Sequence, residues 1–379
     1  MRAKDTNEYW LLVLANNTGI KNPGSCLIDL ISTDALSNDT EIYAEAVVDS
    51  FANVKGGIDR SSALLYYSAF GVEYAFNPSF KLHSEVWLTD NHSVSELVGD
   101  EQGVSNIEAN SAGLHWGKLA LEFSREHLSV LFGIYDINYE FDVLESANLF
   151  VQSAFGMGTV FGVSGPNGPG TYPAPGVTAR FAYYQGNHTA KFAVTDGAPG
   201  SPGLSYRQPS EQPDKTNLLL TGEYQYQDTS TRLLLGWWGY TDDSTYLNSV
   251  QSTGQRNDGW YLRGEHTFND ITLFGRVGAG ASSFNFFDEF YSVGVTGNAG
   301  LIGRADDSWG MAWAHAKVSE NADQPLASGE SVIEMTYSVA VNDYLLIQPN
   351  IQWVGSPGAL LTTDDAVVLG LRFIVSYEE

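Results

Sequence analysis

Apolar and polar residues alternate with a period of two along much of this chain, and this pattern restricts its possible folds more than any other feature. Within the segment 344–354, Ile351 and Trp353 alternate with Gln348 and Gln352. Successive side chains of a β-strand point to opposite faces, so this pattern is typical of a strand between two different environments. No continuous apolar run approaches the roughly 18 residues that a membrane-spanning helix requires. The chain is therefore predicted to be all-β, and any membrane crossing must be made by strands.

The alternation recurs from residue 41 almost to the end of the chain. It predicts about sixteen strands, each close to the roughly ten residues that cross a membrane at a tilt. The predicted strands are 41–54, 61–75, 80–89, 112–124, 127–136, 176–184, 189–196, 216–228, 231–241, 257–267, 270–280, 287–297, 308–317, 330–341, 344–354 and 364–377.

Short and long connections also alternate. Short turns at one end and long loops at the other are typical of outer-membrane barrels, and an even strand number places both termini at the short-turn, periplasmic end. We therefore expect a transmembrane antiparallel β-barrel of about 16 strands, although a soluble β-sandwich or propeller also shows alternation. The alternation requires a short turn after the strand 287–297, but the spacing of the predicted strands leaves a long connection there, 298–307. Tight turns are predicted at 77–78, 124–126, 185–187, 227–229, 269–270 and 342–343, and long connections at 90–111, 137–175, 197–215, 242–256, 318–329 and 355–363.

Composition argues against several classes of function. The 45 acidic residues outnumber the 19 basic ones, and nucleic-acid binding needs the opposite balance. The seven histidines show no metal-ligand spacing, and no glycine-rich phosphate loop is present. Asp136 and Glu140 resemble the carboxylate pair of a glycosidase, but chance pairs are common in so acidic a chain. We expect no enzyme activity, no cofactor, no metal site and no nucleic-acid partner.

In a closed barrel, the residues opposite the lipid-facing row line the lumen. An arginine facing lipid costs about 2–4 kcal/mol at mid-depth, so arginines in strands should point inward. They either contact a polar solute or only neutralise nearby acids, and the sequence leaves both possibilities open. The expected lumen residues are Arg180, Glu223, Arg263, Arg276, Gln348, Gln352 and Arg372.

The longest connection, 137–175, is the candidate constriction loop, because a long loop in a barrel of this size can fold inward. Phe141, Phe150 and Phe155 would then pack on the inner wall. Asp142 and Glu145 would project into the opening, and 142–150 is the one segment with a short-helix pattern. The alternative is a loop on the outer surface.

Several motifs resemble the OprB family of carbohydrate-selective porins. They are 132–142 (FGIYDINYEFD), where Ile134 replaces an expected basic residue, 149–156 (LFVQSAFG), 166–173 (PNGPGTYP) and 348–352 (QPNIQ). The resemblance covers roughly residues 41–377 and implies a sixteen-stranded porin that imports glucose and related sugars. By position it implies that the sugar path is lined by Arg60, Asp136, Asn138, Glu140 and Arg180.

Together these observations predict passive, carbohydrate-preferring diffusion of small sugars such as glucose across the bacterial outer membrane into the periplasm. The alternatives are a non-selective general diffusion porin and a soluble β-rich carbohydrate-binding protein. The expected partners are sugars, outer-membrane lipid and lipopolysaccharide, with the protein a monomer or homotrimer. Overall acidity disfavours anions, but the arginines could reverse this locally, so the ion preference stays open.

Residues 41–379 are expected to form the porin barrel, and 1–40 a divergent N-terminal segment that is periplasmic or plug-like. The acidic Asp5 and Glu8 argue against a secretory signal at the start, so we expect that the signal peptide is not present in this chain.

Overall fold

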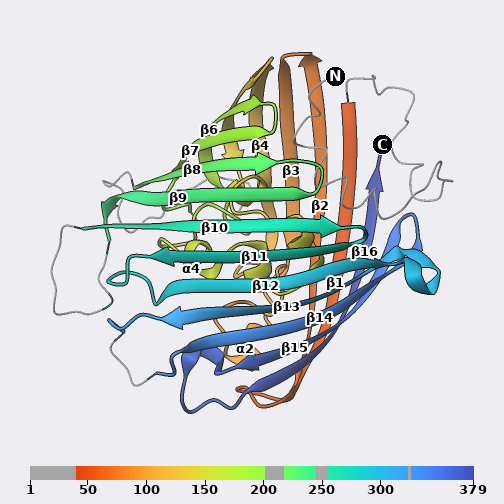
Figure 1. The fold of residues 1–379 in the computed structure, drawn as a ribbon, viewed down its shortest axis with the longest axis vertical. Coiled ribbons are helices and arrows are strands. Elements are labelled where there is room, and N and C mark those ends of the chain that lie inside the picture. Colours follow the sequence, from red (N-terminus) through yellow and green to blue (C-terminus); the bar gives the residue numbers. More distant parts are fainter. Residues whose placement is uncertain (1–39, 201–216, 245–246, 248–254, 323–325) are drawn as a thin grey trace.

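The computed structural model describes residues 40–200, 217–244, 247, 255–322 and 326–379. Within them, sixteen strands follow one another around a closed barrel, each hydrogen-bonded to the next in the sequence. Antiparallel pairing of β1 (Thr40–Lys55) with β16 (Ala366–Glu378) closes the ring (Figure 1). The predicted all-β antiparallel barrel is confirmed. The predicted N-terminal segment 1–40 lies outside the described residues, apart from Thr40, which begins β1.

The other elements follow in chain order. Most predicted strands match the observed ones within a few residues, because the same alternation defines both. The strands are β2 (Ser62–Asn77), β3 (Phe80–Thr89), β4 (Gly113–Arg125), β5 (Leu128–Tyr135), β6 (Gly176–Gln185), β7 (His188–Asp196), β8 (Leu218–Gln227), β9 (Thr231–Asp243), β10 (Arg256–Phe268), β11 (Ile271–Gly280), β12 (Phe287–Ala299), β13 (Arg304–Val318), β14 (Gly329–Asn342) and β15 (Leu345–Gly355). The helices are α2 (Ser95–Val98), η2 (Ile137–Tyr139), η3 (Ser146–Leu149), α3 (Ser153–Gly156), α4 (Thr159–Gly162), η4 (Gly300–Ile302) and η5 (Pro357–Ala359).

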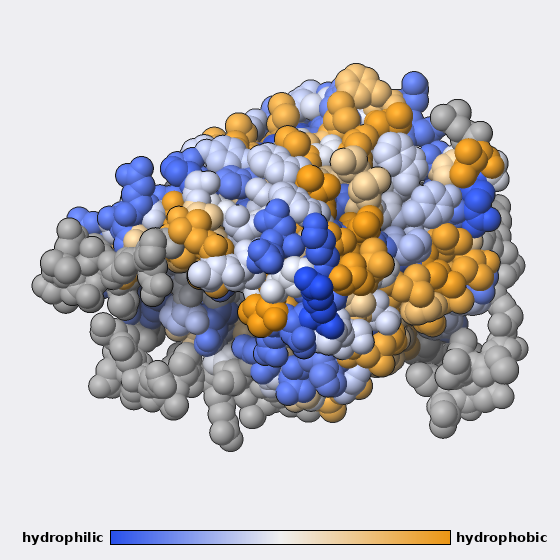
Figure 2. Space-filling model, turned by 90° about the horizontal axis from the view of Figure 1, so that it is seen from below, coloured by the Kyte–Doolittle hydropathy of each residue, from blue (hydrophilic) through white to orange (hydrophobic). Residues whose placement is uncertain are grey.

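The outer face of the barrel is apolar and the inner face is polar. On β10, Trp260 and Leu262 are 45% and 46% exposed, whereas Tyr261 between them and Arg263 after them point to the inner face and are 2% and 1% exposed. Figure 2 shows one face of the molecule, where hydrophobic residues gather over the right-hand part beside more hydrophilic ones on the left. An exposed apolar surface of this kind suits contact with lipid. None of the helices in the described residues has the length and hydropathy to cross a membrane.

The two ends of the barrel differ as predicted, with one correction. Turns such as 78–79 and 126–127 lie at the end of the barrel where β1 starts and β16 finishes. The longer connections lie at the other end. The expected long connection at 298–307 is wrong, because β12 continues to Ala299 and β13 begins at Arg304. Asp307 accepts hydrogen bonds from the Tyr337 hydroxyl at 2.8 Å and the Ala340 amide at 3.0 Å, so polar residues with a loop-like composition extend β13.

Two connections fold into the barrel and carry most of its apolar core. Residues 90–112 are called inner loop 1 and residues 136–175 inner loop 2. Inner loop 2 contains η2, η3, α3 and α4, which lie inside the ring of strands in Figure 1. The short helix expected at 142–150 is shorter in the structure and corresponds to η3. Inner loop 2 packs on the β9–β12 wall through Phe141, Phe150, Phe155 and Phe161, against Trp238, Tyr261, Phe274 and Phe290.

Candidate functional site

Inner loop 2 is fixed to the barrel wall by an ion-pair cluster around Asp142. The Asp142 carboxylate lies 3.0 Å from Nε of Arg276 and 3.4 Å from Nε of Arg263. Arg263 also donates to Glu223 at 2.8 Å, and Lys191 lies 3.0 Å from the other oxygen of Glu223. Burial raises the pKa of Asp142, although the two guanidiniums act in the opposite direction. The cluster joins one loop carboxylate to β7, β8, β10 and β11.

Arg276 also binds the backbone of inner loop 2. Its guanidinium donates to the carbonyl oxygens of Asp142 at 2.8 Å and Gly156 at 3.0 Å. A guanidinium presents five donors in a planar fork, so it can bind several oxygens at once. Arg276 therefore holds two separate parts of the loop against β11.

A second cluster, around Arg180, joins inner loop 2 to β4 and β6. The Arg180 guanidinium lies 3.0 Å from Glu122 and 2.9 Å from Glu140, and Arg180 is 2% exposed. Glu140 also accepts a hydrogen bond from the Tyr135 hydroxyl at 3.0 Å. Asn138, two residues before Glu140, is half-buried and donates to the Phe141 carbonyl at 3.1 Å.

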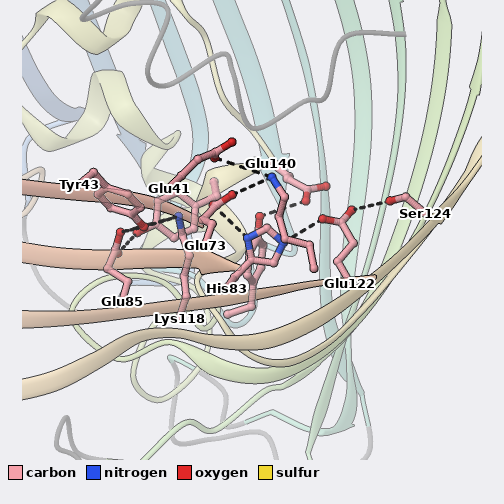
Figure 3. Close-up of polar contacts among 12 residues, drawn as sticks. Glu41, Tyr43, Glu73, His83, Glu85, Lys118, Glu122, Ser124 and Glu140 are labelled. Atoms are coloured by element: carbon pink, nitrogen blue, oxygen red, sulfur yellow. Dashed lines mark hydrogen bonds and ion pairs between the residues drawn. The ribbon is translucent and has the colours of Figure 1, made fainter. Parts of the chain in front are cut away.

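His83 extends this cluster toward β2. Its Nδ1 lies 3.0 Å from Glu73 and its Nε2 lies 2.9 Å from Glu122 (Figure 3). Lys81 reaches the same Glu73 at 3.1 Å. An imidazole ring donates from both nitrogens only when it is protonated, so two carboxylates on opposite sides favour the imidazolium. A continuous line of alternating charges therefore runs along the inner face from β2 to β6.

Glu85 is the centre of a third group on the same wall. Its carboxylate accepts hydrogen bonds from the Tyr43 hydroxyl at 2.5 Å, from Nε1 of Trp87 at 2.6 Å and from the Tyr139 hydroxyl of inner loop 2. Lys118 Nζ lies 3.7 Å from Glu85 and 3.8 Å from the centre of the Tyr139 ring. Figure 3 shows Tyr43, Glu85 and Lys118 beside Glu73 and His83.

Further polar contacts hold the inner loops at other points. Glu145 and Glu265 lie 2.5 Å and 3.6 Å from Arg232. Arg372 pairs with Asp49 at 2.7 Å. The last contacts are from side-chain amides to loop carbonyls, with Gln348 donating to Leu149 and Gln352 to Val104, at 2.7 Å and 2.8 Å.

The structure places the predicted sugar-path residues at two different levels. Asp136 is buried, and its carboxylate accepts hydrogen bonds from the amides of Asn138 at 2.7 Å and Tyr172 at 2.8 Å. Burial raises the pKa of Asp136 to about 6. Asp136, Asn138, Glu140 and Arg180 therefore belong to one region. Arg60 is instead exposed in the connection 56–61 at the long-loop end, and among the described residues it has no ion pair with this region.

The predicted lumen residues are all on the inner face. Phe141, Phe150 and Phe155 are buried against the wall, and Glu145 is half-buried. Asp142 was expected to project into the opening, but it is fully buried because it pairs with Arg263 and Arg276 of the wall. Every one of the strand residues in this prediction is buried, namely Arg180, Glu223, Arg263, Arg276, Gln348, Gln352 and Arg372.

A family model described as "Carbohydrate-selective porin, OprB family" matches residues 46–377. The chain belongs to this family. Porin B of Pseudomonas aeruginosa is 22% identical over 152 residues, which cover 33% of this chain and 34% of Porin B. The chain thus aligns with about a third of the length of that curated relative.

Solved structures share the fold of this OprB-family chain. The high-pH structure of OprB from Pseudomonas putida has a TM-score of 0.79 and 16% identity, and the match covers 89% of this chain and 94% of that one. A trimer form of OmpT from Vibrio cholerae has a TM-score of 0.55 and 11% identity, with 89% and 99% covered. Family and fold together place the protein in the bacterial outer membrane as a porin.

Several polar residues of this porin were missed by the sequence analysis. Glu73, His83, Glu85, Lys118 and Glu122 all belong to the clusters described above. A usable signal was present, because Lys81, His83, Glu85 and Trp87 occupy every second position of one strand. Within the described residues, no group of three His, Cys, Asp or Glu side chains is arranged to hold a metal ion.

Proposed function

We propose that this porin lets small sugars such as glucose diffuse passively through the lumen into the periplasm. The observation that carries the proposal is the line of paired charges on β2–β6, next to Asn138 and Glu140 of inner loop 2. Paired charges keep a passage hydrated without offering a strong site to any single ion. Such a wall favours neutral, polar solutes.

The expected mechanism is an exchange of hydrogen bonds along this wall. Sugar hydroxyls replace water on amide and carboxylate groups such as those of Asn138 and Glu140, and each contact stays weak enough for the solute to leave. Asp136 acts through position, because it fixes the backbone of η2 from which Asn138 projects. Arg60 would meet the solute earlier, at the long-loop end.

The test is single-channel conductance in planar bilayers, with glucose titrated from one side. Stepwise channels that glucose blocks in a saturable manner support sugar-preferring diffusion. Channels that ignore glucose identify a general diffusion porin and contradict the preference. Protein that stays monodisperse without detergent and forms no channels contradicts the porin function itself.

Asp136→Ala is expected to raise the glucose concentration of half-maximal block by about tenfold, because losing the carboxylate that fixes η2 displaces Asn138 and costs about 1.5 kcal/mol of its contact with the sugar. Arg60→Ala, measured in parallel, tests the predicted contact at the long-loop end. An unchanged block in both variants would remove these residues from the sugar path.

A further inference from the structure

A carboxylate without a protein partner faces the lumen from β1. Val47 and Asp49 are buried on the inner face of this strand, and Glu45, two residues before Val47, shares that face and is half-buried. The residues opposite Glu45 on the two neighbouring strands are small, Ala69 on β2 and Ser376 on β16. Among the described residues, no hydrogen bond or ion pair reaches the Glu45 carboxylate. A partly buried carboxylate in this state requires water or a ligand.

Tyr67 lies beside Glu45 on the same inner face. It is opposite Val47, so Tyr67 and Glu45 are diagonal neighbours across β1 and β2, a distance that long side chains can span. The Tyr67 ring centre lies 6.4 Å from that of Trp87 and 5.6 Å from that of Tyr172. Its hydroxyl has no hydrogen-bond partner within the described part of the chain.

The packing of inner loop 1 ends next to this position, on the side of the long-loop end. Val47, Phe51 and Leu65 form one apolar cluster with inner loop 1, and Tyr67 packs against the edge of that cluster. On the other side, the Tyr43 ring lies flat on β2, because a Cβ added to Gly71 would be 2.0 Å from its Cζ. Glu45 therefore lies between the packed region on the side of the long-loop end and the polar Tyr43 and Glu85 group on the side of the short-turn end.

We propose that Glu45 and Tyr67 form a sugar-contact site in the lumen. The C–H face of a pyranose would lie on the Tyr67 ring, which Tyr172 supports edge to face at an interplanar angle of 81°, and two of its hydroxyls would donate to the Glu45 carboxylate. A carboxylate accepts several hydrogen bonds at once, and tyrosine offers an apolar ring and a polar hydroxyl at low entropic cost. This inference rests on the proposed sugar permeation and adds the residues that recognise the sugar.

The site is tested by glucose titration of single channels of the full chain, comparing wild type with Glu45→Gln and Tyr67→Phe. Glu45→Gln is expected to raise the half-blocking concentration about tenfold, and Tyr67→Phe about fivefold, because a charged hydrogen bond contributes more than a neutral one. Two matched controls should leave the block unchanged. Tyr66→Phe alters the adjacent outward-facing ring, and Glu41→Gln removes an exposed carboxylate from the same strand.

The outcomes separate this inference from the proposed function. Wild-type block that persists unchanged in both variants overturns the site and leaves sugar permeation standing. Wild-type channels without block contradict the proposed function and the site together. If Glu45→Gln shifts only the zero-current potential in a KCl gradient, Glu45 attracts ions and the site is also overturned. Should Glu45→Gln fail to assemble, Glu45→Asp withdraws the carboxylate by one methylene and gives the same comparison.

Discussion

Arg180 illustrates how a single residue connects this barrel. Its buried guanidinium neutralises Glu122 on β4 and Glu140 on inner loop 2, so removing it leaves Glu140 without a basic partner among the described residues and Glu122 with His83 alone. Breaking a buried ion pair from one side is strongly destabilising, because the remaining charge has no compensation.

Arg180→Met is expected to lower the free energy of unfolding by about 3–5 kcal/mol, measured by urea denaturation in detergent. Arg125→Met, at an exposed position at the end of β4, is the control and should change stability by less than about 0.5 kcal/mol. Adding Glu140→Gln to Arg180→Met should restore part of the loss, since it removes the carboxylate that Arg180 alone had neutralised. Equal stabilities of Arg180→Met and the control would contradict this role.

At the scale of elements, inner loop 2 is positioned by carboxylates that accept backbone amides. Asp136 starts η2 by accepting from the Asn138 amide at 2.7 Å, and it holds the later part of the loop through the Tyr172 amide at 2.8 Å. Burial raises its pKa to about 6, above the value of about 3.9 for an exposed aspartate. The folded protein therefore binds this proton more tightly than the unfolded chain does.

Acidification from pH 7 to pH 5 should stabilise the fold through Asp136 by about 1 kcal/mol, and a pH rise through about 6 should remove that contribution. Asp136→Asn cannot titrate and keeps one acceptor oxygen. The difference in unfolding free energy between wild type and this variant should therefore change by about 1 kcal/mol between the two pH values. Parallel pH dependences of the two proteins would contradict the assignment.

At the scale of the whole molecule, the interior contains more acid than base. Each lysine or arginine on the inner wall has a carboxylate within 4 Å, as seen for Lys81, Lys118, Arg180, Lys191, Arg232, Arg263, Arg276 and Arg372. Several interior carboxylates lack a basic partner among the described residues, namely Glu45, Asp100, Glu108, Asp136, Glu330 and Glu334.

This imbalance predicts that the channel prefers cations to anions, because a lumen lined by one sign of charge concentrates the opposite ion. The measurement is the zero-current potential in a KCl gradient at pH 7. Burial raises the pKa of Asp100 and of Asp136, so the preference should weaken at pH 5. A preference for chloride at pH 7 would show that the arginines dominate the passage after all.

Much of the fold was predictable from local pattern. The alternation in 257–267 and 364–377 identified strands and the inward position of Arg263 and Arg372, because a strand face is a property of neighbouring residues. The polar composition of 304–308 predicts a loop, but β13 extends there because Asp307 accepts hydrogen bonds from β14.

The sequence by itself determined the barrel, its strands and which face of each strand points inward, since these depend on period and length alone. Only the tertiary structure decided which charges pair. Arg372 and Asp49 are 323 positions apart and meet because β1 and β16 close the ring. Arg180 meets Glu140 because inner loop 2 folds inward, and Glu45 stays without a partner because no described cation reaches β1 at that level. Pairing depends on register and loop path, which no local pattern specifies.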